Sequence, residues 1–147
     1  MDEIRLAKTL YLAEHLGGVF YDHFCDHVDN GDVKGTFSGF AGDEHSHASW
    51  YAEWLDAKGH APPGAAALRT LVVPSLRLAL APAPLKRKLE TFAFTEAAAA
   101  RHLHSLARKV RDPELKAIVE RTIPYEEKHA RWYREQGRRM LRAQDAK

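Results

Sequence analysis

Two copies of one pattern, 82 positions apart, constrain this chain more than any other feature. In the first copy, Glu14 is followed thirty residues later by Glu44, which opens a Glu-x-x-His motif. In the second copy, Glu96 stands thirty residues before Glu126, which opens the same motif. The register holds without a gap, and the matching pairs are His47 with His129, Trp50 with Trp132, Tyr51 with Tyr133, and Glu53 with Glu135. The sequence is therefore interpreted as a duplicated unit.

Each of the four glutamates lies within a stripe of apolar residues that recur every three or four positions. This spacing is typical of a helix that turns one face toward a core. His47 and His129 follow their glutamates by one helical turn, so each Glu–His pair shares a helix face. The expected helices cover about 2–28, 32–58, 85–110 and 112–142. The pattern therefore predicts four buried carboxylates and two buried imidazoles.

A lone carboxylate is costly to bury, so buried carboxylates are usually paired or bound to a metal ion. Four glutamates and two histidines on four helices form the ligand set of a two-metal site in a helical bundle. Two divalent ions would balance the four negative charges, and oxygen-rich sites with imidazole suit iron or manganese. The predicted ligands are Glu14, Glu44, His47, Glu96, Glu126 and His129. The alternative interpretation is a duplicated hairpin that carries these residues on a solvated surface.

The predicted fold is all-α, a four-helix up-down-down-up bundle that forms a single domain over residues 1–147. Short links make 2–58 and 85–142 two antiparallel hairpins. Between them, the proline-rich segment 59–84 is long enough to serve as a crossover from one end of the bundle to the other. This segment is apolar, and three interpretations remain open: packing on the bundle, a dimer interface, or a lid over a lipophilic substrate. Its prolines exclude a bilayer-spanning helix.

Composition narrows the class of protein further. A formal net charge of +2 gives no reason to expect a nucleic-acid partner. Cys25 is the only cysteine, so the chain offers neither a disulfide framework nor a Cys-x-x-Cys iron site. The first residues lack the apolar core of a signal peptide, and no transmembrane segment is expected. A cytoplasmic homodimer is the expectation.

The segments Leu12–Glu14 and Asp43–His47, with Thr95–Glu96 and Glu126–His129, resemble the ferritin-like superfamily and, within it, the rubrerythrin-like diiron carboxylate proteins. The resemblance covers nearly the whole chain and implies two iron ions, with manganese as a possible replacement. It implies that Glu14 and Glu96 each bind one ion, that Glu44 and Glu126 bridge, and that His47 and His129 each complete one ion. Rubrerythrins usually carry a further carboxylate one turn after the first ligand of the third helix, whereas here alanines occupy 97–100.

Three functions are consistent with these residues. The first is a diiron oxidoreductase that reduces peroxide or dioxygen, or oxidises ferrous iron, with an unknown electron donor. The second is an oxygenase that acts on a hydrophobic organic substrate beside the apolar crossover. The third is a metal-binding helical protein without catalysis. Three tyrosines lie on the ligand stripes: Tyr21, Tyr51 and Tyr133. They could donate a hydrogen bond or an electron, or they could simply fill the core.

Overall fold

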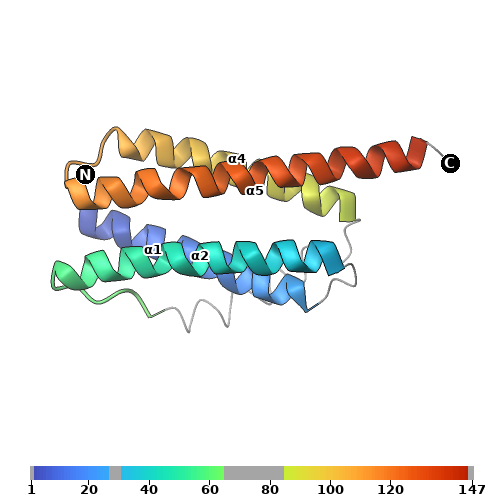
Figure 1. The fold of residues 1–147 in the computed structure, drawn as a ribbon. Helices are drawn as coiled ribbons and strands as arrows, with labels where there is room; N and C mark the ends of the chain where they lie inside the picture. The colour runs from blue at the N-terminus through green and yellow to red at the C-terminus, as the bar shows by residue number, and fades with distance from the viewer. Residues whose placement is uncertain (1, 27–30, 65–84, 146–147) are drawn as a thin grey trace. The chain divides into compact units, whose positions relative to one another are not determined.

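The computed structural model describes residues 2–26, 31–64 and 85–145. These residues form four helices and no strand: α1 (Glu3–Cys25), α2 (Gly31–Ala57), α4 (Leu85–Ala107) and α5 (Pro113–Asp145) (Figure 1). The prediction of an all-α chain with four helices is confirmed. The apolar part of the crossover, 68–80, lies outside the described residues, as does the predicted last residue of the first helix, Val28.

The chain divides into two compact units. The first contains α1, α2 and the first turns of α5, and the second contains α4 and the rest of α5. Each unit thus contains one of the two predicted helix pairs. The prediction that 1–147 forms a single domain stays a prediction.

In the first unit, α1 and α2 pack side by side and run in opposite directions (Figure 1). Asp2 is the N-cap of α1, and its carboxylate accepts a hydrogen bond from the backbone N–H of Arg5 at 3.0 Å. Aromatic side chains fill the space between the two helices: the Tyr21 ring lies 5.9 Å from Phe37 and 5.6 Å from Phe40. All three are buried, as the apolar stripes predict.

The end of α2 and the start of α5 are joined by side-chain contacts within the first unit. α2 ends at Ala57, one residue before the predicted end at 58, and Gly59 follows with a φ of 75°, which is favourable for glycine. Asp112 caps α5 by accepting hydrogen bonds from the backbone N–H groups of Glu114 and Leu115. The same carboxylate accepts a hydrogen bond from Trp54 Nε1 at 3.1 Å and lies 2.9 Å from Lys58 Nζ. One residue therefore caps one helix and fastens it to another.

The second unit packs α4 against the part of α5 that follows Ile118. The Phe92 and Tyr133 rings are stacked with centroids 5.2 Å apart, and both side chains are buried. α5 continues without interruption through Pro124, which is exposed, and extends three residues beyond the predicted end at 142. This long continuous helix carries two of the predicted ligands.

α4 is shorter than predicted: it ends at Ala107 and not at Val110. The reason is a contact from a distant part of the chain. The Glu3 carboxylate accepts hydrogen bonds from the backbone N–H groups of Arg111 and Asp112, which draws the link toward the start of α1. The link therefore leaves the helix before the apolar periodicity ends.

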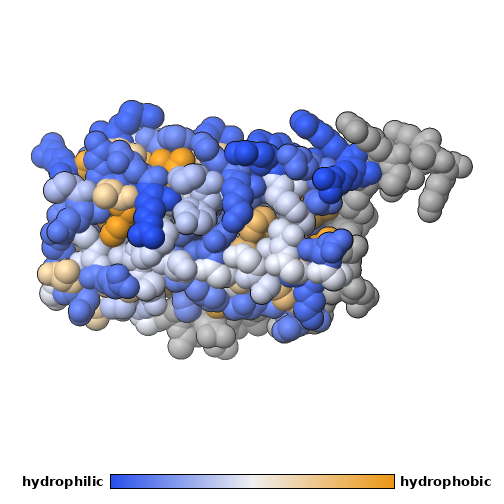
Figure 2. Space-filling model, in the orientation of Figure 1, coloured by the Kyte–Doolittle hydropathy of each residue, from blue (hydrophilic) through white to orange (hydrophobic). Residues whose placement is uncertain are grey.

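Polar side chains cover most of the described surface in the view of Figure 2. Among the described residues, Phe94 is the only large hydrophobic side chain that is mainly exposed, at 70%. No helix within the described ranges is both long and apolar enough to cross a membrane.

Candidate metal centre

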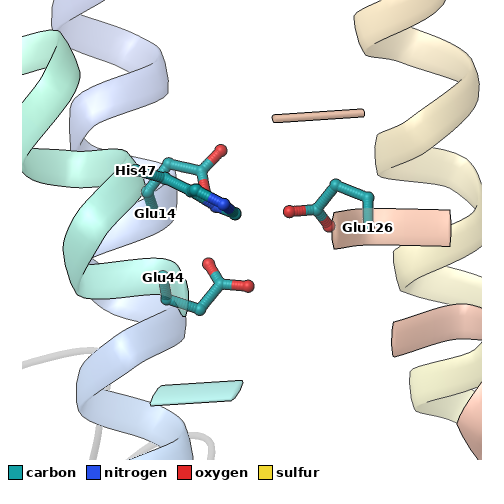
Figure 3. Close-up of side chains that lie close together, drawn as sticks. All are labelled: Glu14, Glu44, His47 and Glu126. Atoms are coloured by element: carbon teal, nitrogen blue, oxygen red, sulfur yellow. The ribbon is translucent and has the colours of Figure 1, made fainter. Parts of the chain in front are cut away.

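The first unit brings together Glu14 from α1 with Glu44 and His47 from α2, called here the first half-site. All three are buried, and His47 is fully inaccessible to solvent. The Nδ1 atom of His47 lies 2.9 Å from the Oε2 atom of Glu14. One possible ligand atom from each residue lies within 4.8 Å of the others. Figure 3 shows the three side chains turned toward a common space; Glu126, also labelled there, belongs to the second unit.

Local sequence explains how the first half-site is built. Glu44 and His47 are three residues apart on α2, so they project from the same face one turn apart. The carboxylate of Glu44 reaches the α1 backbone at Gly17, where a Cβ atom would stand 2.5 Å from Oε2 of Glu44. A side chain at position 17 would therefore force the Glu44 carboxylate to move. Glycine at this position leaves the space that the carboxylate occupies.

The second unit repeats this arrangement with Glu96 from α4 and with Glu126 and His129 from α5, called here the second half-site. Glu126 and His129 are buried, and the Glu96 side chain is 12% exposed. The Nδ1 atom of His129 lies 4.0 Å from Oε2 of Glu96. One possible ligand atom from each of the three residues lies within 4.8 Å of the others. In both half-sites the histidine Nδ1 atom thus faces the Oε2 atom of the glutamate from the other helix, and the distance between these two atoms is longer in the second half-site.

The donor atoms of each half-site fit a divalent ion. Two ligand atoms bound about 2.1 Å from one octahedral ion at right angles are roughly 3 Å apart. The separation of 2.9 Å between His47 Nδ1 and Glu14 Oε2 matches that value. Carboxylate oxygens with one imidazole nitrogen suit iron or manganese better than they suit metals that prefer thiolates. Each half-site therefore has the chemistry to hold one such ion.

The three tyrosines predicted from the ligand stripes are buried, with exposures of 2% for Tyr21, 0% for Tyr51 and 1% for Tyr133. Tyr51 and Tyr133 each follow a half-site histidine by four residues, so they lie one turn further along the same helix face. Tyr21 lies two turns after Glu14 and packs among phenylalanines. Their redox or hydrogen-bonding role stays a prediction.

Sequence reasoning missed one pair of contacts beside the half-sites. His45 Nε2 lies 2.8 Å from Asp22 Oδ2 in the first unit, and His104 Nε2 lies 3.0 Å from Glu127 Oε1 in the second. Positions 22 and 104, like 45 and 127, are 82 apart, so the two pairs occupy equivalent positions with acid and base exchanged. This exchange could have been found in the sequence by comparing the two copies for opposite charges.

Comparison of the sequence with known proteins identifies the family of this chain. No curated protein and no solved structure matches the chain significantly. The rubrerythrin family model matches residues 9–136, a range that contains both half-sites and the ligand-bearing turns of all four helices. Rubrerythrins are part of the ferritin-like superfamily, whose members carry carboxylate–histidine metal sites in helical bundles. This chain belongs to the rubrerythrin family.

Proposed function

We propose that this protein is a diiron carboxylate oxidoreductase that reduces peroxide or dioxygen, or oxidises ferrous iron. The observation that carries the proposal is the duplicated, buried Glu–His pair: His47 with Glu14, and His129 with Glu96. A single structural ion would need one such set, whereas two sets would hold two ferrous ions, each of which can give one electron. In this proposal the two half-sites act as a single two-metal centre.

The proposed roles follow from the chain's own residues. Glu14 and His47 would hold one ion, and Glu96 and His129 would hold the other. Glu44 and Glu126, each buried and each one turn before a histidine, would be shared between the ions. When bound, two ferrous ions would supply the two electrons that convert hydrogen peroxide and two protons into two molecules of water.

The protein must also exclude water and supply hydrogen-bond donors near the metal ions. Buried apolar neighbours such as Phe92 and Phe40 keep solvent from the half-sites. Tyr51 and Tyr133 carry hydroxyl groups one turn beyond the histidines, where they would donate a hydrogen bond or an electron. An electron donor would return the ions to the ferrous state, and a homodimer remains the proposed assembly.

The other two functions have less support. An oxygenase acting on a hydrophobic substrate rests on the apolar crossover, which lies outside the described residues. A metal-binding protein without catalysis has the same half-sites, so it becomes one outcome of the experiment below.

The experiment measures metal content, then the optical spectrum and peroxide consumption after anaerobic loading with ferrous iron. We expect about two irons per chain, as in other two-metal bundle proteins. The double variant Glu44→Ala/Glu126→Ala should lose both ions. Its matched control is Glu53→Ala/Glu135→Ala, which removes two exposed carboxylates that also lie 82 positions apart on α2 and α5.

Two results would count against the proposal. Two irons retained by the Glu44→Ala/Glu126→Ala variant would contradict the ligand assignment. Two irons bound by the unchanged protein, with neither peroxide nor dioxygen consumed and no ferrous iron oxidised, would favour the non-catalytic function.

A further inference from the structure

α4 and α5 border a groove of about 280 Å³ on the second unit. Its lining, called here the arginine groove, consists of Ala97, Ala100, Arg101, His104, Glu127, Ala130, Arg131 and Arg134. Ala100 and Ala130 are buried and form its floor, whereas the three arginines are exposed. The small alanines at the floor and the long arginines at the border leave a space that is open to solvent.

The groove is strongly positive. Three guanidinium groups border it against the single carboxylate of Glu127, and that carboxylate already lies 3.0 Å from His104. Within the described part of the chain, Arg101, Arg131 and Arg134 form no ion pair with a carboxylate. Like charges brought together from two helices repel one another, and an anion bound between them would relieve that repulsion.

The first hairpin provides an internal control, because it has the same helix pairing without these charges. The positions equivalent to Arg101, Arg131 and Arg134 hold Val19, Ser49 and Ala52. Packing of the duplicated hairpin therefore does not require a cation at any of the three positions.

The space itself also differs between the two hairpins. Gly18 is equivalent to Ala100, and a Cβ atom on Gly18 would stand 2.6 Å from atoms of the His45 imidazole. The His45 ring thus fills, in the first hairpin, the place that is a groove in the second. An acid–imidazole pair occurs in both hairpins, whereas the three arginines around the groove belong to the second hairpin.

We propose that the arginine groove binds the phosphate group of a small phosphorylated molecule. A guanidinium presents N–H groups in a planar fork that matches the oxygens of phosphate, with charge-assisted hydrogen bonds. A phosphate monoester has three terminal oxygens and nearly two negative charges, which suits three arginines better than a carboxylate with two oxygens and one charge. The alanine floor leaves room for the rest of the ligand beside the phosphate.

The test is a calorimetric titration of the full-length protein at low ionic strength, with inorganic phosphate and then phenyl phosphate as probes. Arg131→Gln/Arg134→Gln should weaken phosphate binding by about tenfold or more, since it removes two charged donors. The matched control, Arg5→Gln/Arg108→Gln, removes the same charge from exposed positions outside the groove and should bind as the unchanged protein does. Equal weakening in both variants, or in neither, would overturn the proposal.

A second variant tests whether phosphate binding depends on the shape of the groove and not only on its positive charge. Ala97→Leu keeps all three arginines but fills the space beside them, so phosphate binding should weaken at unchanged net charge. Binding that is unaffected by this change would show a general attraction to a basic surface and would overturn the proposal. Binding of inorganic phosphate with exclusion of phenyl phosphate would restrict the groove to the free ion and contradict the small-molecule assignment.

Discussion

At the scale of single residues, the first half-site depends on the close approach of a carboxylate to a helix backbone. Glu44 lies where a side chain on Gly17 would otherwise be, with Oε2 and Cδ at 2.5 and 3.0 Å from the position of a Cβ atom. Glu44 is also 5% exposed, so its carboxylate has little free space into which it could move without changing its contacts. Gly17 is therefore a positioning residue for the proposed ligand Glu44, although it offers no donor atom.

We expect Gly17→Ala to weaken metal binding without unfolding the protein. The added methyl group displaces the Glu44 carboxylate from the half-site, and loss of correct ligand orientation typically costs on the order of tenfold in metal affinity. Alanine is the better helix former, by up to about 1 kcal/mol per residue, so helix stability should not fall. Ferrous or manganous ion affinity, measured by competition with a chelator, checks the first effect, and circular dichroism checks the second.

Gly39→Ala is the matched control, because Gly39 is exposed on α2 and a Cβ atom there meets nothing within 4 Å. It should leave metal affinity unchanged. The second hairpin carries Ala99 at the position equivalent to Gly17, so the hairpin itself accommodates a methyl group there. Unchanged metal affinity in Gly17→Ala would show that Glu44 is not held where the first half-site needs it.

At the scale of elements, Asp112 joins the start of α5 to the end of α2. Its pKa is lowered from 3.8 to about 2, first by the hydrogen bond from the Leu115 backbone N–H and next by Lys58. The same contact raises the pKa of Lys58. Because the folded pKa of Asp112 is depressed, its contribution to stability is present above about pH 4 and is lost as the pH falls toward 2.

Asp112→Ala should reduce the free energy of unfolding by about 1 kcal/mol at pH 7, the usual loss for an N-cap. Asp112→Asn should lose less, because the amide oxygen still caps the helix, and it should flatten the fall in stability between pH 4 and 2. Urea denaturation followed by circular dichroism across this pH range measures both effects. Asp56→Asn, an exposed change on α2, is the control, and an equal flattening there would contradict the role of Asp112.

The elements also show how far sequence alone could reach. The 82-residue register and helical periodicity predicted the helix pairs and the buried glutamates and histidines. The early end of α4 was not predictable, because Glu3 fixes the link from 108 positions away in the sequence. The role of Gly17 was not predictable either, because the close approach of two helices produces no periodic pattern in the sequence.

The arginine groove shows a different limit. Its residues were visible in the sequence, but Arg101 lies on α4 and Arg131 and Arg134 lie on α5. Each arginine alone has the pattern of a solvated helix face. Only the packing of α4 against α5 brings these three cations around one space, so the site follows from tertiary structure.

At the scale of the whole molecule, both units bury acidic groups that an ordinary helical core would avoid. Glu14, Glu44 and Glu126 are each no more than 6% exposed, and Glu96 is only slightly more so. Removing carboxylates from water costs free energy unless a cation or hydrogen bonds compensate for it. An ion that binds these groups in the folded state and not in the unfolded chain should therefore stabilise the whole protein.

Metal loading should raise the thermal unfolding midpoint. At a free ion concentration 100 times Kd, binding contributes about 2.7 kcal/mol for each ion. A change of 1 kcal/mol moves Tm by roughly 2–4 °C in a chain of this size, so each bound ion should raise Tm by roughly 5–10 °C. Manganous ion is a suitable probe in air, and ferrous iron is its counterpart under anaerobic conditions. Removal of the ion with a chelator should reverse the rise in Tm.

The variant Glu44→Ala/Glu126→Ala should show almost no rise in Tm, whereas Glu53→Ala/Glu135→Ala should behave as the unchanged protein does. An equal rise in all three proteins would mean that the ions stabilise the chain from surface sites and that the buried glutamates are held by other means.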